Sequence, residues 1–383
     1  MEKQNNKEYR LRAKTTATIN RDLKRTGKAI VALGCSYAQG HGAFDEETLK
    51  LVRPKISSTF SNFDYMFKGH TESELQLLAD HYDLELIEKS EVAEHWNGSE
   101  SQYAVATHEI ETANSFVNQI CEKLGNRYTP INFGHAGNGN LASINRLFTF
   151  PIDWHLCDEI ILLWCYSDPN RFDIVDDRFP FNKHLVLHDH ATMWPQFQDE
   201  YDPECEKLRQ GSLWFETQRT YTQTLWSDKF SYTNFLNAGI QLSVWAKAHN
   251  AKLVTFGAFQ PCTKEDIING LLDTEVVRDP GTRQLIESKK RRILRHEIIE
   301  AKKGIDMFPW KSVFNPGGYN TFFDLAYSQE PDYIPGTTMH DVVNNCLESG
   351  DDWIFPCGHP SAKAHTLLSD IILEHLNLGY QND

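Results

Sequence analysis

The sequence lacks the features that mark several large classes of protein. It has no apolar run near the roughly 20 residues that a membrane-spanning helix needs, and its N-terminal residues are polar and charged. Positive charge is in deficit, since 38 Lys and Arg face 53 Asp and Glu for a formal net charge of −15. Binding to nucleic acid or to an anionic membrane would therefore act against electrostatic repulsion. We expect neither partner, and we expect synthesis in the cytoplasm without a signal peptide.

Cysteine motifs are also lacking. The eight cysteines are scattered and no C-x-x-C occurs, which indicates reduced thiols rather than a disulfide framework. His184, His188 and His190 lie close together, but no acidic or thiolate ligand matches them. We therefore assign no metal and no cofactor. The 383 residues, 40% of them apolar, are enough for a large hydrophobic core.

Apolar strands alternate with helical patterns along the chain, as an open and mostly parallel α/β sheet flanked by helices requires. Strands are predicted at residues 29–33, 128–133, 159–166 and 252–256. We assign residues 1–27 to an N-terminal extension without periodicity and residues 28–383 to one α/β domain. Two large insertions are predicted in that domain, at about residues 45–105 and 260–350.

Helices are expected between these strands. A single helix is predicted over residues 107–124, ended by Gly125 and Asn126, and a final helix follows residue 361. The basic stretch "LIESKKRRILRHEIIEAKK", which begins at Leu285, is predicted to form a solvated helix.

Three loops carry polar or glycine-rich sequence where the fold would bring them together. They are Gly34-Cys35-Ser36, residues 134–140, and Gly358-His359-Pro360. Loops at the carboxyl ends of parallel strands form the ligand-binding edge of such a sheet. Taken singly, Ser36 is an ordinary helix-capping serine and His359 an ordinary residue at a helix start. The segment is neither a G-x-S-x-G elbow, because Ala38 replaces the second glycine, nor a phosphate-binding P-loop.

Taken together, the three loops resemble the blocks of the SGNH/GDSL hydrolase superfamily in their order along the chain. That resemblance implies a flavodoxin-like three-layer sandwich, with Ser36 as nucleophile and His359 as general base. This sequence departs from the family pattern at two positions. Cys35 stands where aspartate is usual, and Pro356 stands where the triad aspartate would lie, three residues before the histidine. Asp351 or Asp352 could serve as the acid instead, or a backbone carbonyl could orient the imidazole, with a lower rate expected.

The resemblance also implies an oxyanion hole and a substrate site. The amides of Ser36 and Gly137 would bind the oxyanion, helped by the side chain of Asn140 or Asn170. Asn140 may equally be read as a turn residue, and Arg171 as either a site for an anionic substrate group or a structural ion pair.

The function implied is that of a serine esterase that hydrolyses a small-molecule or carbohydrate ester, for example an O-acyl group on a sugar. The alternative is a structural or interaction protein that keeps the fold with little or no catalysis. Virion partners or a homo-oligomer would fit that alternative, because divergent family members of this kind occur in bacteriophage genomes. A transferase using the same Ser-His pair is a third reading.

Overall fold

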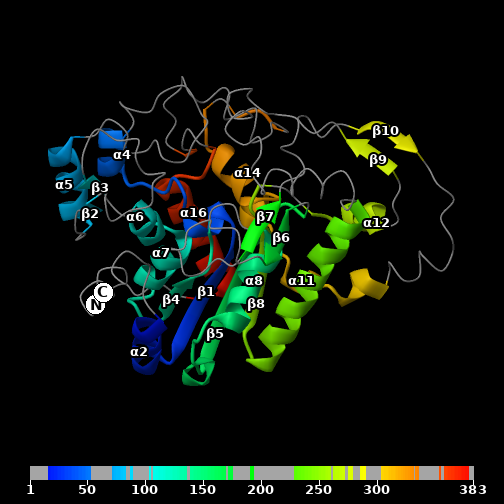
Figure 1. The fold of residues 1–383 in the computed structure, drawn as a ribbon, viewed down its shortest axis with the longest axis horizontal. Coiled ribbons are helices and arrows are strands. Elements are labelled where there is room, and N and C mark those ends of the chain that lie inside the picture. The colour runs from blue at the N-terminus through cyan, green and yellow to red at the C-terminus, as the bar shows by residue number, and fades with distance from the viewer. Residues whose placement is uncertain are drawn as a thin grey trace.

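A four-stranded parallel sheet forms the centre of the protein (Figure 1). Its strands are β1 (Lys28–Gly34), β4 (Thr129–Asn132), β5 (Glu159–Tyr166) and β8 (Lys252–Gly257), in the order β4-β1-β5-β8. The parallel α/β sheet expected from the sequence is thus confirmed. The computed structural model describes residues 16–52, 71–82, 87–88, 103–104, 107–135, 139–169, 171–175, 190–193, 228–259, 262–271, 275–278, 285–289, 303–331, 333–335, 353–354 and 358–378.

The strand order places the end of β1 at a change in the direction of the chain. From β1 the chain adds β4 on one side, and then crosses to add β5 and β8 on the other. Gly34, the last residue of β1, is in register with Cys165 of β5. In open α/β sheets, ligands bind outside the carboxyl ends of the strands at such a switch point. Ser36 follows β1 at this position.

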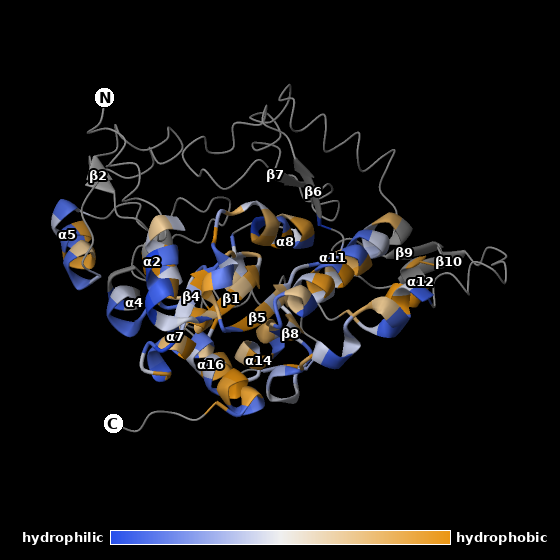
Figure 2. Ribbon diagram, turned by 90° about the horizontal axis from the view of Figure 1, so that it is seen from below, coloured by the Kyte–Doolittle hydropathy of each residue, from blue (hydrophilic) through white to orange (hydrophobic). Residues whose placement is uncertain are grey.

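Helices cover both faces of the sheet and give each face its own hydrophobic core. One face packs against α7 (Phe116–Lys123), α14 (Phe322–Tyr327) and α16 (Ala362–Leu376). The other packs against α2 (Thr16–Thr26), α8 (Asn140–Thr149) and α11 (Asp228–Ala248). Figure 2 shows the apolar central strands between these two helical layers. Strand β1 is buried on both sides because its apolar residues alternate between the two cores, which explains its unbroken apolar sequence.

Two helical segments differ from the sequence prediction. Residues 16–26, assigned to an extension without periodicity, form α2 and bury Ile19 and Leu23 against the sheet. The helix predicted over residues 107–124 is divided into α6 (Thr107–Ala113) and α7, and Ser115 is the N-cap of α7. The predicted stop is confirmed, because Gly125 and Asn126 both adopt positive φ.

The start of the basic stretch in the second insertion is not helical. Leu285–Lys289 forms strand β10, which pairs antiparallel with β9 (Glu275–Arg278), so the prediction of a helix is wrong there. Cross-strand pairing overrides the helix propensity of Glu and Lys in this hairpin. Other described elements are β6 (Phe172–Val175), paired with β7 (His190–Met193), helix α12 (Lys264–Leu271), a helical turn at residues 303–307 and the 3-10 turns at Trp154–Leu156, Trp310–Ser312 and Pro316–Gly318. Among the described helices, none combines the length and apolarity needed to cross a membrane.

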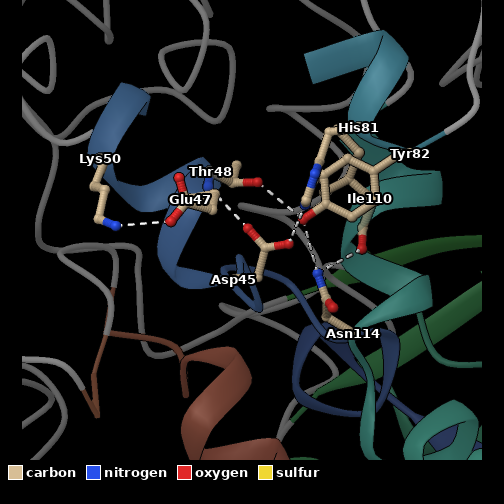
Figure 3. A network of polar contacts seen from close by, with 8 residues as sticks. All are labelled: Asp45, Glu47, Thr48, Lys50, His81, Tyr82, Ile110 and Asn114. Atoms are coloured by element: carbon tan, nitrogen blue, oxygen red, sulfur yellow. Dashed lines mark hydrogen bonds and ion pairs between the residues drawn. The ribbon is translucent and has the colours of Figure 1, made fainter. Parts of the chain in front are cut away.

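The segment predicted as the first insertion, residues 45–105, is joined to α6 by a network of polar side chains (Figure 3). The described elements of this segment are α4 (Glu46–Val52), α5 (Glu72–His81), and β2 (Ile87–Glu88) paired with β3 (Tyr103–Ala104), and the short helix α3 (Ser36–Gln39) precedes them. Asp45 accepts hydrogen bonds from the backbone of Thr48, over 2.8 Å, and from Nε2 of His81, over 2.7 Å. The Tyr82 hydroxyl lies 2.9 Å from that of Thr48 and accepts a bond from Asn114, which follows α6. The network therefore joins α4 and α5 to the end of α6.

Candidate active site

Ser36 is presented by a sharp turn at the end of β1. Gly34 has φ of +150°, and a Cβ at this position would lie 2.3 Å from the carbonyl oxygen of Cys165. Only glycine fits between the two strands here, and the chain can turn at once into the short helix α3. Ser36 begins that helix, and its carbonyl accepts hydrogen bonds from the amides of Gly40 and His41. The nucleophile candidate is thus held on a tightly closed turn and is only 5% exposed.

His359 lies in a second loop that is also held firmly. Gly358 before it has φ of +78°, and Pro360 after it forms an antiparallel bridge with Ile354. Behind this bridge, a carboxylate oxygen of Glu330 accepts hydrogen bonds from the amides of Trp353 and Ile354. The histidine is therefore fixed at the start of α16 with 7% of its surface exposed.

The structure brings Ser36 and His359 into hydrogen-bond contact. The Ser36 Oγ lies 2.7 Å from Nε2 of His359, although 323 positions separate them in the sequence. If Nε2 is the acceptor, the neutral ring carries its proton on Nδ1, the tautomer that a general base requires. This arrangement allows the hydroxyl proton to pass to the imidazole as the oxygen attacks an electrophile.

Tyr37 connects the two loops. Its hydroxyl donates a 2.9 Å hydrogen bond to the carbonyl of Gly358, and its ring centroid lies 5.1 Å from that of His359. A residue adjacent to Ser36 thus holds the residue adjacent to His359.

Glu111 and His41 form a buried pair beside His359 that the sequence reading did not single out. The Nδ1 atom of His41 lies 2.9 Å from a carboxylate oxygen of Glu111, and both side chains are buried. The His41 ring meets the His359 ring edge-on, with the centroids 4.7 Å apart. One signal was present in the sequence: Glu111 is a charged residue directly after Ile110 of the apolar helical stripe.

Asn140 lies at the start of α8, and its side chain is bonded to the segment after β5. Its Nδ2 donates to the carbonyls of Ser167 and Asp168, and its Oδ1 accepts from the amide of Ser167 over 2.8 Å. In this arrangement Asn140 fixes the loop at the end of β5. A direct bond from Asn140 to an oxyanion stays a prediction.

Arg171 contacts an aromatic ring that leads toward Tyr37 and His359. Its guanidinium carbon lies 4.9 Å from the ring centroid of Phe259, and the Phe259 ring lies 5.4 Å from that of Tyr37. Arg171 is therefore linked to His359 through two aromatic rings. Its role toward an anionic substrate group stays a prediction.

The other predicted site residues cannot be placed. Gly137, Asn170, Asp351, Asp352 and Pro356 lie outside the described residues, as do His184 and His188. Within the described ranges, no three His, Cys, Asp or Glu side chains are grouped so that they could hold a metal ion.

Comparisons of the chain with protein-family models, curated proteins and solved structures find no match.

Proposed function

We propose that the protein is a serine esterase of the SGNH type, with Ser36 as nucleophile and His359 as general base. The observation that carries the proposal is the 2.7 Å contact between Ser36 Oγ and His359 Nε2. Two features support it. The pair lies beyond the carboxyl end of β1, and the order β4-β1-β5-β8 corresponds to the first four strands of a flavodoxin-like sheet.

The proposed reaction proceeds in two halves. Ser36 Oγ attacks the ester carbonyl while its proton passes to His359 Nε2, which forms a tetrahedral oxyanion and an imidazolium. The imidazolium then protonates the leaving alkoxide as the acyl–oxygen bond breaks, leaving an acyl-serine. Water attacks that ester while His359 takes its proton, and the imidazolium then returns the proton to Ser36 Oγ as the acyl–Oγ bond breaks. The carboxylic acid is released, and Ser36 and neutral His359 are restored. The amides of Ser36 and Gly137 would bind the oxyanion, and each such donor is worth about 3 kcal/mol.

The proposed substrate is an O-acyl ester on a small molecule or a carbohydrate, and the reaction needs no cofactor. Arg171 would receive an anionic group of that substrate, because its guanidinium lies on the aromatic wall that leads to His359 through Phe259 and Tyr37.

A fluorophosphonate probe tests the proposal directly. We expect the probe to label the wild type at Ser36 and to form no adduct with Ser36→Ala. The labelling rate of His359→Ala should be at least about 100-fold lower than that of the wild type. Ser328→Ala, which changes a serine after α14, is the control and should label like the wild type. Two negative results together would reject the esterase: no labelling of the wild type, and hydrolysis of p-nitrophenyl acetate by the wild type no faster than by Ser36→Ala. They would favour a non-catalytic protein with this fold.

A further inference from the structure

We propose that Glu111 and His41 are positioning residues for His359: they hold its ring edge-on and place a buried negative charge behind it. This inference rests on the proposed function for its catalytic meaning, but the contacts that carry it are independent of any substrate. It concerns a carboxylate on α6, a helix outside the two loops that carry the Ser-His pair.

The first step of the argument is the environment of Glu111. The carboxylate accepts hydrogen bonds from Nε2 of Gln39 over 3.0 Å and from the amide of Gly42 over 3.2 Å, in addition to its contact with His41. Gln39 is the last residue of the Ser36 helix, and His41 and Gly42 lie in the turn that follows it. An ionised carboxylate accepts at both oxygens and donates at neither, so this set of donors suits the charged form.

The second step is burial. Glu111 is 2% exposed and His41 is 5% exposed. Burying a charge is costly unless it is paired and hydrogen-bonded, so a buried carboxylate with three donors is a specific construction. Gly40 allows α6 to approach this closely, because a Cβ there would lie 2.5 Å from the Glu111 carbonyl oxygen.

The third step is the contact with the base. We take His41 to be neutral, donating from Nδ1 to Glu111, so that the pair carries one net negative charge. The His41 ring separates that charge from His359, and the planes of the two histidine rings meet at 84°. When Ser36 transfers its proton, His359 becomes an imidazolium, and a nearby negative charge favours this form. No proton moves through His41; the pair acts by charge and by position.

Within the part of the chain that the structure describes, titratable side chains approach His359 from α3, from the turn after α3 and from α6. Tyr37 contacts the ring from α3, and His41 contacts it from the turn after α3. Glu111 reaches it from α6 through His41. Tyr37 is bonded to the carbonyl of Gly358 as a neutral donor, whereas Glu111 brings a carboxylate to this group of described residues.

The test is an NMR titration of His359 in protein with 13C-labelled histidine, with the signal assigned by His359→Asn. We expect Glu111→Gln to lower the titration midpoint of His359 by about 0.5 to 1 pH unit, because it removes the negative charge and keeps a similar shape. The matched control is Glu159→Gln. Glu159 begins β5 at the opposite edge of the sheet and also accepts bonds from a lysine and a tyrosine. Its loss should leave the midpoint within about 0.2 unit.

An unchanged midpoint in Glu111→Gln would overturn the inference. If Glu111→Gln does not fold, His41→Gln replaces it as the test. This variant keeps a donor for Glu111 but lets water screen the charge, so the titration midpoint of His359 should fall by less than in Glu111→Gln. An unchanged midpoint in His41→Gln would then overturn the inference. Fluorophosphonate labelling separates the two proposals. A wild type that does not label while the midpoint still falls in Glu111→Gln rejects the esterase and leaves the coupling of Glu111 to His359 standing.

Discussion

The hydroxyl of Tyr37 donates a hydrogen bond to the carbonyl oxygen of Gly358 over 2.9 Å, and this bond joins the loop of Ser36 to the loop of His359. The two loops come from opposite ends of the sequence and from different elements, β1 and α16. Their relative position therefore depends on a small number of direct contacts, of which this is one.

Tyr37→Phe should weaken the Ser-His pair without removing either member. Loss of the hydroxyl leaves the Gly358 carbonyl without this donor in a buried place, which costs about 1 to 2 kcal/mol. We expect fluorophosphonate labelling to slow about 10-fold, because small displacements of reacting groups are costly. The labelling rate and the thermal unfolding midpoint measure the two effects.

Tyr128→Phe is the matched control for that variant. Tyr128 donates a 2.8 Å hydrogen bond to Glu159 at the amino end of β5, away from the Ser36 loop at the carboxyl end of β1. Its loss should lower stability to a similar or smaller extent and leave labelling unchanged. Equal labelling rates for Tyr37→Phe and the wild type would show that the loops keep their geometry without the bond.

Gly34→Ala should destabilise the whole fold. The new methyl group would meet the Cys165 carbonyl at 2.3 Å and the Ala38 Cβ at 2.9 Å, at a φ of +150° that side chains rarely adopt. We expect a loss of about 3 kcal/mol or more in the free energy of unfolding, measured with urea. Gly304→Ala is the control. A Cβ there meets its nearest atom at 3.6 Å in a helix, so a gain of about 0.5 to 1 kcal/mol is expected.

The sheet could be predicted from the sequence because its central strands are long apolar runs. The predicted limits of the strand at residues 159–166 agree with β5, and the strand at residues 252–256 lacks only the last residue of β8. The loops after these strands could then be placed at one edge of the sheet by topology alone. That reasoning places Ser36 at this edge, whereas His359 precedes a helix and is matched to Ser36 through the family resemblance in the order of the three loops.

The remaining features depend on contacts between distant parts of the chain. Nothing local to Glu111 indicates that it faces the Ser36 turn, because helix periodicity places it only beside the apolar stripe. The division of α6 from α7 at Ser115 occurs without Gly or Pro, and strand β10 uses residues that favour a helix in isolation. In each case the deciding interaction is a tertiary one that propensity and spacing do not contain.

Asp45→Asn should loosen the first insertion and leave the sheet intact. Although partial burial acts to raise it, the pKa of Asp45 is lowered by hydrogen bonds from Thr48 and His81. The charged carboxylate is thus the form that holds α4 and α5 together (Figure 3). We expect faster amide hydrogen exchange in residues 72–81 and unchanged protection in β1 and β5.

The control for this prediction is Glu47→Gln. Glu47 pairs with Lys50 in the same helix, but both side chains are exposed, so little change is expected. Because the pKa of Asp45 is lowered in the fold, its stabilisation is present above about pH 4 and is lost as the pH falls through the lowered value. Exchange in residues 72–81 should therefore rise on acidification in the wild type, and less so in Asp45→Asn.

His365 should make the protein sensitive to acid. Complete burial lowers the pKa of His365 to about 3, and its Nδ1 accepts a hydrogen bond from the amide of Phe116. The unfolded chain takes up this proton below about pH 6.5 and the folded chain does not, so stability falls by about 1.4 kcal/mol per pH unit below that value. His365→Asn retains an acceptor for Phe116 but does not titrate. Between pH 6.5 and 4.5 its free energy of unfolding in urea should therefore fall less steeply than that of the wild type, and the difference in slope should correspond to about one proton. His155→Asn changes an exposed histidine and should keep the wild-type slope. Equal slopes for His365→Asn and the wild type would show that other groups cause the acid sensitivity.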